Sequence, residues 1–191
     1  MTPIEIIAVL CGLLSVILTI KQNIWCWPVG LVQVVLFIGI FYEAKLYSDM
    51  VLHIIYVFLQ FYGWYHWLYG DKNRDRLPVT QLDLIPLAIW CGVVVAGTSL
   101  WGYAMFRWTD AAFPFADAFI MVASLVAQWL MAQKKLQSWW FWISVDVVAV
   151  YVYWYKELNL TAILYAIFLV LATLGWLAWR KTYLQPELNA A

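Results

Sequence analysis

The chain has 191 residues, of which 66% are hydrophobic and 12% are charged, and its formal net charge is zero. Soluble domains average about 25% charged residues and about 45–50% apolar residues. The composition therefore excludes an ordinary soluble domain and predicts an integral membrane protein, and the zero net charge argues against a nucleic-acid partner.

Seven apolar runs follow one another along the chain, separated by charged connections. Each run is close to the roughly 20 residues that a helix needs to span a bilayer, and period-two alternation, the mark of a β-barrel strand, is lacking. We interpret the first run as an uncleaved helix, because Glu5 lies where a signal peptide would have its basic region. We predict an all-α membrane protein with seven transmembrane helices, at residues 4–20, 24–43, 49–69, 82–102, 112–132, 138–155 and 158–179.

The basic residues predict the orientation of these spans. With seven spans, three Lys or Arg residues fall on the side of the N-terminus and eight on the opposite side. Because cytoplasmic loops are enriched in Lys and Arg, we predict the N-terminus outside and the C-terminus in the cytoplasm. The first group is Lys45, Arg107 and Lys156, and the second is Lys21, Lys72, Arg74, Arg76, Lys134, Lys135, Arg180 and Lys181.

Matching motifs indicate an internal repeat. A G-W-x-x-W motif closes the third run at 63–67 and the seventh at 175–179, and at the same offset Leu46 corresponds to Leu158. After a small insertion or deletion, the N-x-x-x-W motif at 23–27 corresponds to the S-x-x-x-W motif at 138–142. Tryptophans at helix ends also form interfacial belts in membrane proteins, which is the alternative interpretation of the G-W-x-x-W pair.

The repeat predicts the domain organisation. Each three-helix unit ends on the opposite side of the membrane from where it began, so one extra helix must return the chain before the second unit. This gives parallel repeats in a three-plus-one-plus-three plan, a transporter architecture with its site near the midplane. The units are residues 1–69, the loop and linker helix 70–106, and residues 107–191.

Two carboxylates, Asp117 and Asp146, lie more than two residues inside the apolar runs; the others lie at run ends or in connections. Asp146 is about 12 Å into its helix at about 1.5 Å per residue, close to the centre of a hydrocarbon core about 30 Å thick. Asp117 is shallower, near the outer end of the fifth run. Neither has a Lys or Arg at matching depth in its own run, so each must face a cavity, a polar partner or a cationic ligand, or be protonated.

The aspartate in the sixth run shares a helix face with two indoles. Trp139, Trp142 and Asp146 are spaced by three and four residues, which places them on one side of an α-helix. Indole faces attract cations and a carboxylate adds charge and hydrogen-bond acceptors, so the face predicts a site for a flat, cationic small molecule. The alternative is an interfacial tryptophan pair with Asp146 bonded to a neighbouring Tyr or Ser.

The first half offers an opposite wall. Asn23 and Trp27 open the second run, where Pro28 loosens the helix and frees backbone acceptors. Tyr56 and Gln60 lie on one face of the third run with His53, a candidate proton relay, although a lone histidine is more often structural. Polar residues of this kind also serve as interhelical glue.

Catalytic and metal-binding signatures are lacking. The sequence contains no H-E-x-x-H, no G-x-S-x-G and no glycine-rich phosphate loop. Two histidines and three dispersed cysteines argue against a metal site. We therefore expect neither an enzyme nor a cofactor-binding protein.

The stretch KKLQSWWFWISVDVVAVYVYWYKELNLTAILY at 134–165 resembles the PnuC family of bacterial vitamin transporters, whose members carry an S/N-W-x-x-W motif followed by an Asp one turn on. The stretch at 41–49 is similar to the family's F-Y-x-A-x-L-Y-A-D pattern, and 63–67 to its G-W-x-x-W. The resemblance runs from about residue 20 to 180, and the predicted fourth helix matches poorly.

The resemblance implies a nicotinamide riboside transporter with a SWEET-like three-plus-one-plus-three fold in the bacterial inner membrane, commonly a homotrimer. It implies facilitated diffusion, with the vitamin trapped by a cytoplasmic kinase, and substrate contacts at Trp139 and Trp142. Related branches carry thiamine (PnuT) or riboflavin. Nicotinamide riboside and thiamine are both flat aromatic cations and stay unresolved by residue arguments, whereas uncharged riboflavin is disfavoured.

The sequence also leaves other functions open. A proton-coupled transporter would use Asp117, Asp146 or His53. A membrane receptor or assembly subunit would share the Trp-rich composition without transport. A membrane-embedded enzyme is disfavoured by the missing catalytic motifs.

Overall fold

The computed structural model describes residues 2–43, 47–70 and 77–185. These residues form seven α-helices and no strand, which confirms the predicted helical architecture. The last residues of α4 and α7 lie beyond the predicted ends, at Trp108 and Leu184. The helices are α1 (Pro3–Ile20), α2 (Cys26–Glu43), α3 (Tyr47–Tyr69), α4 (Leu84–Trp108), α5 (Pro114–Ala132), α6 (Ser138–Tyr155) and α7 (Asn159–Leu184).

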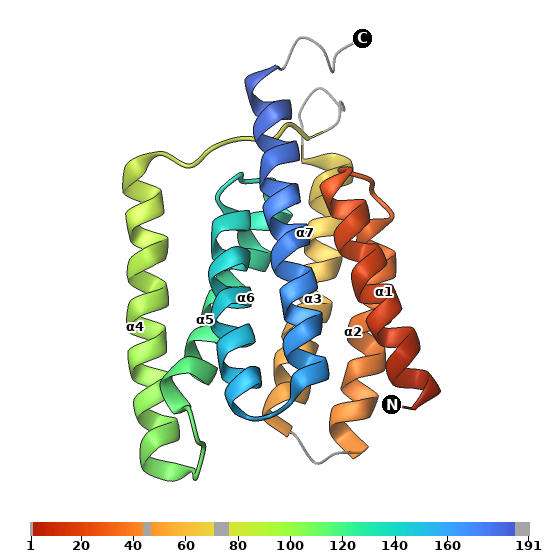
Figure 1. Ribbon diagram of the computed structural model, residues 1–191. Coiled ribbons are helices and arrows are strands. Elements are labelled where there is room, and N and C mark those ends of the chain that lie inside the picture. The colour runs from red at the N-terminus through yellow and green to blue at the C-terminus, as the bar shows by residue number, and fades with distance from the viewer. Residues whose placement is uncertain (1, 44–46, 71–76, 186–191) are drawn as a thin grey trace.

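The two ends of the described chain lie at opposite ends of the bundle (Figure 1), as an odd number of spans requires. Helix α1 begins with a capping box in which the Thr2 side chain accepts from Glu5 N and the Glu5 side chain accepts from Thr2 N.

Several residues on which the predicted repeat and orientation partly depend lie outside the described residues: Lys45, Leu46, Lys72, Arg74 and Arg76.

Five of the helices are long and apolar enough to cross a membrane by length and composition: α1, α2, α4, α5 and α7. Helices α3 and α6 fall below that criterion because Tyr, Trp and His have low hydropathy, and α6 also contains Asp146. The two least apolar helices are therefore the ones that carry most of the predicted site residues.

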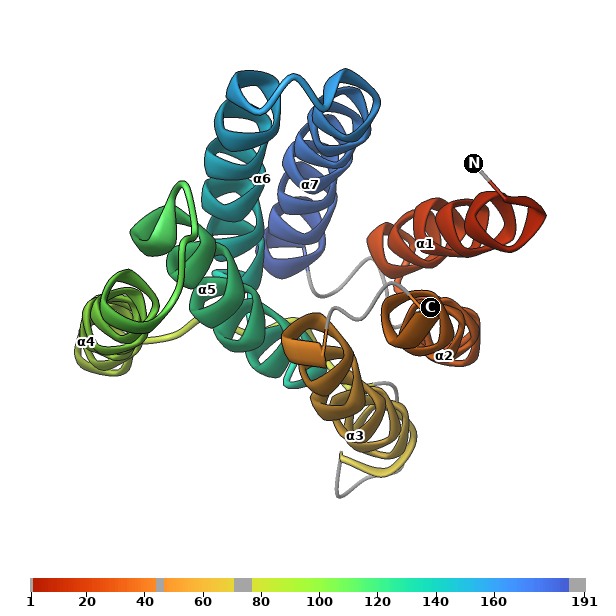
Figure 2. The same ribbon diagram turned by 90° about the horizontal axis from the view of Figure 1, so that it is seen from below.

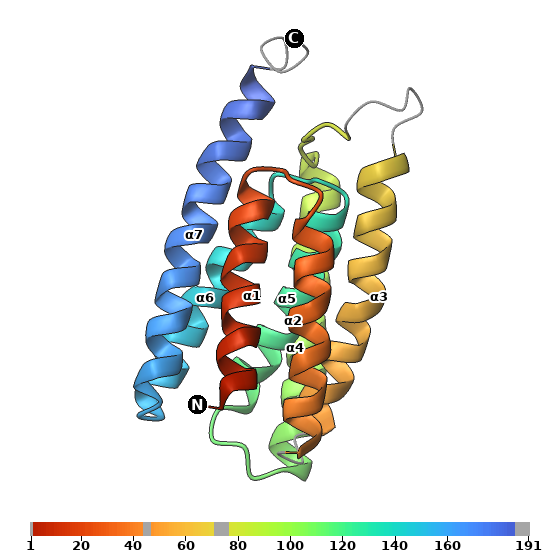
Figure 3. The ribbon, with the colours of Figure 1, turned by 90° about the vertical axis from the view of Figure 1, so that its right-hand side faces the viewer.

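Six helices form a closed ring. The packed pairs are α1 with α2, α2 with α3, α3 with α5, α5 with α6, α6 with α7, and α7 with α1. Figure 2 shows this ring along its axis, and Figure 3 shows α1 between α7 and α2. Helix α4 lies outside the ring, and α5 is the one described helix that it packs against (Figure 2). The middle of the ring is therefore enclosed by three helices from each half of the chain.

The connections α1–α2 and α5–α6 have the same backbone structure, 112 positions apart. Gln22 and Lys134 both adopt left-handed conformations, with φ of 53° and 50°. Gln22 N donates to Thr19 O (2.9 Å), and Lys134 N donates to Met131 O (3.0 Å). Five further pairs of backbone hydrogen bonds repeat with the same shift, from Lys21 N and Gln133 N to Val29 N and Phe141 N.

This shift corrects one predicted correspondence. The sequence comparison matched Trp27 with Trp142 by assuming an insertion or deletion. In the structure the Trp27 ring lies against Gly63, and the Trp139 ring lies against Gly175 in the same way. Trp27 therefore corresponds to Trp139 without any insertion, because the glycines of the two G-W-x-x-W motifs receive these two rings.

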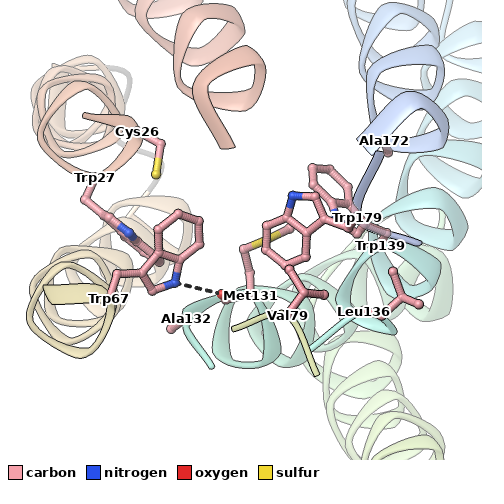
Figure 4. Packing of buried hydrophobic residues seen from close by; sticks show 10 residues of the cluster. All are labelled: Cys26, Trp27, Trp67, Val79, Met131, Ala132, Leu136, Trp139, Ala172 and Trp179. Atoms are coloured by element: carbon pink, nitrogen blue, oxygen red, sulfur yellow. Dashed lines mark hydrogen bonds between the residues drawn. The ribbon is translucent and has the colours of Figure 1, made fainter. Parts of the chain in front are cut away.

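The main core lies at the end of the bundle where α1 ends and α2 begins, which we call the tryptophan end. Four indoles form a chain across it, with ring-centroid distances of 5.3 Å (Trp27–Trp67), 6.0 Å (Trp67–Trp179) and 5.4 Å (Trp139–Trp179). Figure 4 shows these rings with the aliphatic residues around them. The chain passes from two rings of the first half, Trp27 and Trp67, to two rings of the second half, and the Trp67–Trp179 contact joins the halves.

Candidate functional site

Asp146 lies halfway along α6 and is 4% exposed. Among the described residues its carboxylate has no hydrogen-bond partner and no ion-pair partner. Burying a carboxylate without a partner costs free energy unless a donor or a positive charge reaches it. The position therefore favours a ligand that brings one of these groups to mid-depth.

Tyr165 on α7 links this carboxylate to two further tyrosines and, through Tyr56, to a serine. Asp146, Tyr56 and Tyr153 all lie within electrostatic reach of Tyr165 on α7. The Tyr153 and Tyr165 rings stack, with centroids 5.2 Å apart and planes at 16°. Tyr56 and Ser124 share a hydrogen bond of 2.5 Å between α3 and α5. We call Tyr56, Ser124, Asp146, Tyr153 and Tyr165 the mid-depth cluster; it joins four helices of the ring.

The predicted indole face of α6 divides into two parts. Trp139 is 2% exposed and packs edge-on against Trp179, so it belongs to the core of the tryptophan end. Trp142 lies one turn closer to Asp146, is partly buried, and packs against the hydrophobic clusters on both sides of α6. Of the two indoles, Trp142 is the one placed to meet a ligand at Asp146.

On the opposite wall, Gln60 and Tyr56 lie one turn apart on the same face of α3, as predicted. Gln60 is 9% exposed, and its amide has no hydrogen-bond partner among the described residues. Trp27 lies deeper in the tryptophan end, 3% exposed, with its indole N–H buried and unpaired within the described part of the chain. Gln60 is thus a buried amide between the mid-depth cluster and the indole chain.

Asn23 does not join this wall. It precedes α2 and is exposed, and its Oδ1 accepts a hydrogen bond from Trp25 N (3.0 Å). An asparagine side chain often bonds the backbone two residues on in a turn of this kind. Its role in the structure is to shape the α1–α2 connection.

Lys134 closes the tryptophan end. This buried residue lies in the α5–α6 connection and donates to Leu77 O (2.8 Å) and to Gln22 Oε1 (3.4 Å). Its ammonium lies 4.4 Å from the centroid of the Trp67 ring. Thr80 N donates to Lys134 O (3.0 Å), which fastens the segment before α4 to the same connection. Lys134 therefore links the two halves and the segment before α4 at this end.

Asp117 lies at the end of the bundle opposite the indole chain. It occupies the first turn of α5, and Lys156 Nζ lies 3.3 Å from its Oδ1. Both side chains are about one-third exposed, at 30% and 28%. The expected polar partner of Asp117 is thus a lysine from the α6–α7 connection, at the end opposite the indole chain.

Two residues of this arrangement were missed in the sequence. Tyr153 is seven residues after Asp146, so the same helical spacing that linked Trp139 to Asp146 could have found it. Lys134 had no such signal, because its partners come from two separate connections and from helix α3. The described residues contain no group of three or more His, Cys, Asp or Glu side chains that could hold a metal ion.

A family model described as nicotinamide mononucleotide transporter matches residues 2–181. The nicotinamide riboside transporter PnuC of Escherichia coli (strain K12) is 26% identical over 201 residues, which cover 92% of this chain and 84% of that protein. The nicotinamide riboside transporter PnuC of Neisseria mucosa is 27% identical over 186 residues, covering 92% and 71%. The riboflavin/roseoflavin transporter RibM of Streptomyces davaonensis is 25% identical over 182 residues, covering 92% and 83%.

A solved structure is also similar. The crystal structure of the vitamin B3 transporter PnuC matches with a TM-score of 0.71 and 27% sequence identity, covering 92% of this chain and 79% of that chain. The similarity therefore extends over nearly all of the fold described above.

Proposed function

The chain belongs to the PnuC family of nicotinamide mononucleotide transporters, and on that premise we propose that it carries nicotinamide riboside, an NAD precursor, across the membrane. It is a multi-pass membrane protein. The names of the E. coli and N. mucosa relatives support this substrate, while RibM indicates that similar chains carry other vitamins.

One observation carries the choice of substrate: a buried carboxylate without a protein partner lies one turn from a partly buried indole. The pyridinium ring of nicotinamide riboside is flat and positively charged. It can stack on the face of Trp142 while its charge meets Asp146. The tyrosine and serine hydroxyls of the mid-depth cluster can exchange hydrogen bonds with the ribose.

The same cluster favours the riboside over the mononucleotide named in the family description. A phosphate group would bring negative charge beside Asp146, where like charges repel. The described Lys and Arg residues all lie at helix ends or in connections: Lys21, Arg107, Lys134, Lys135, Lys156, Arg180 and Lys181. A phosphate at mid-depth would therefore lack a basic partner. Riboflavin, which is uncharged and larger, matches the carboxylate and indole less well.

The proposed site uses residues from both halves. Trp142 and Asp146 hold the cationic ring, and Tyr56 and Gln60 offer hydrogen bonds from α3. Trp27 and Trp139 form its floor at the tryptophan end. Asn23 and Asp117, which the sequence also suggested, lie outside it.

The proposed transport is facilitated diffusion, in which a cytoplasmic kinase traps the vitamin by phosphorylation. Thiamine uptake by the same mechanism is the alternative, because thiamine is also a flat aromatic cation. A proton-coupled transporter and a receptor without transport are less favoured.

The proposed architecture is three-plus-one-plus-three with parallel, SWEET-like repeats. It is supported by the closed ring of six helices and by the identical α1–α2 and α5–α6 connections. The excess of Lys and Arg at the tryptophan end supports an N-terminus outside and a C-terminus in the cytoplasm of the bacterial inner membrane. The outlying α4 is apolar on all sides, and a homotrimer is proposed on the family resemblance.

The substrate is tested by calorimetry in detergent with nicotinamide riboside, nicotinamide mononucleotide, thiamine and riboflavin. We expect saturable binding of the riboside and none of the mononucleotide. Tighter binding of thiamine would indicate that thiamine is the substrate. Binding of the mononucleotide alone would contradict the expected repulsion between its phosphate and Asp146.

Transport is tested with the purified protein in liposomes that contain labelled substrate on one side. We expect the label to equilibrate across the membrane without being concentrated, with or without a pH gradient. Accumulation driven by a pH gradient would favour the proton-coupled mechanism, and binding without flux would favour a receptor.

A further inference from the structure

Gly30 is a buried glycine in α2, on which side chains of two other helices rest. A Cβ atom built on Gly30 would lie 2.6 Å from Gln60 Nε2 and 2.9 Å from Ser15 Oγ. Real Cβ atoms do not make contacts this short. Gly30 is therefore the point where side chains from α1 and α3 meet over the bare backbone of α2.

The amide that rests on Gly30 is free to serve a ligand. The Gln60 side chain is 9% exposed and has no hydrogen-bond partner among the described residues. A buried amide without a partner costs free energy, which a ligand recovers when it supplies the missing hydrogen bonds. Gln60 also lies one turn from Tyr56, a member of the mid-depth cluster that bonds across to Ser124.

The repeat explains why a glycine is needed in this half. The shift of 112 positions that matches Trp27 with Trp139 also matches Gly30 with Trp142. In the second half this position carries the indole proposed to stack on the substrate. In the first half the same position is Gly30, which has no side chain, and the Gln60 amide and the Ser15 hydroxyl occupy the space.

We propose that Gly30 is a positioning residue for substrate recognition: its missing side chain lets the Gln60 amide reach the substrate from the wall opposite Trp142. The ligand chemistry implied is a flat cation with a group that both donates and accepts hydrogen bonds, such as a hydroxyl or carboxamide. This inference rests on the proposed function for the identity of the ligand.

The first test is a double-mutant cycle on the affinity for nicotinamide riboside, measured by calorimetry in detergent. Gly30→Ala displaces the Gln60 amide at the end of a flexible side chain and turns the Ser15 hydroxyl, so it should fold and weaken binding about tenfold, as for one lost hydrogen bond. Gln60→Leu should give a similar loss. The double variant should bind no more weakly than Gln60→Leu alone, because Gly30 acts through Gln60.

The matched control is Gly12→Ala in α1. A Cβ there would lie 2.8 Å from Nε2 of Gln33, so it displaces a glutamine amide in the same way, and neither Gly12 nor Gln33 is among the residues of the proposed site. Both changes also replace a helical glycine with alanine, so their effects on helix propensity are equal. We expect Gly12→Ala to leave the affinity unchanged. Additive losses in the cycle, or an equal loss in the control, would overturn the proposal.

A second variant decides the question if Gly30→Ala does not fold. Gln60→Asn keeps the amide but withdraws it by one methylene, and it should weaken binding as much as Gln60→Leu does. Wild-type affinity in Gln60→Asn would overturn the role of amide position. If the wild type binds thiamine rather than nicotinamide riboside, the proposed substrate fails, and the same variants are compared with thiamine.

Discussion

At the tryptophan end, Trp27 of α2 and Trp139 of α6 occupy matched positions and pack in the same way against Gly63 and Gly175. Deeper in the bundle the match of side chains ends. The counterpart of Gly30 is Trp142, and the counterpart of Val34 is Asp146 at the same shift. At the tryptophan end the two halves thus match in both backbone and side chains. In the middle of the bundle they match in backbone alone.

The hydrogen bonds between the halves follow the same division. Trp67 Nε1 donates to Met131 O (3.3 Å), and Trp179 Nε1 donates to Thr19 O (3.1 Å), so each half closes on the other by the same crossed bond. At mid-depth the bond between Tyr56 and Ser124 has no such mate, since the matched positions carry Phe168 and Gly12. The shared end therefore joins the two halves by equivalent contacts, whereas the unlike middle suits a ligand with two different faces.

The largest expected effect is on stability at the shared end. Trp27→Ala and Trp139→Ala each remove a buried indole that packs against a glycine of α3 or α7. Each should lower the free energy of unfolding by about 3–5 kcal/mol. Thermal unfolding in detergent, followed by circular dichroism, measures both. Trp140→Ala is the control, because that indole is 42% exposed. Clearly unequal losses at Trp27 and Trp139 would break the comparison between the halves.

The next effect is on affinity at the unlike middle. Asp146→Asn keeps the shape of the side chain but removes its charge, and it should weaken nicotinamide riboside binding about a hundredfold, since losing one partner of a buried charge pair costs about 2–5 kcal/mol. Calorimetry measures the change. Ser144→Ala is the control on the same helix, where the hydroxyl donates to Phe141 O within α6 (2.8 Å). An unchanged affinity in Asp146→Asn would remove the carboxylate from the site.

Trp142→Ala should weaken binding about thirtyfold, because a desolvated cation–π contact is worth about 2 kcal/mol. The variant should lose less stability than Trp139→Ala, because Trp142 is only partly buried. Trp142→Phe keeps an aromatic face and should recover most of the affinity. If Trp142→Ala instead lost stability and kept its affinity, Trp142 would belong with the structural indoles.

The sequence predicted some features of the tryptophan end and of the middle of the bundle, and missed others. Seven helices were predictable because each apolar run matches a bilayer span, and Asp146 was recognisable as a carboxylate inside such a run. The correspondence of Trp27 was wrong because Trp139 and Trp142 are both tryptophans, and only their packing against Gly175 tells them apart. Asn23 belongs to a turn, and the role of Lys134 depends on connections far apart in the chain, which spacing alone does not bring together.

A smaller effect is expected at the crossed bonds. Trp67→Phe and Trp179→Phe keep aromatic packing but remove one N–H donor each, and each should cost about 1 kcal/mol of unfolding free energy. The two values should agree, because the two bonds are related by the repeat. A much larger loss for Trp67→Phe would mean that the Lys134 ammonium over that ring dominates at this end.

The smallest effect is expected at Asp117, at the far end from the indole chain. Its ion pair with Lys156 is about one-third exposed, so Asp117→Asn should change the unfolding free energy by only about 0.5 kcal/mol. The affinity for nicotinamide riboside should stay at the wild-type value, as should that of Lys156→Met. Because Asp117 and Asp146 are the two carboxylates that the sequence placed inside helices, measuring both by calorimetry separates the binding carboxylate from the structural one. A tenfold loss in Asp117→Asn would return Asp117 to the site.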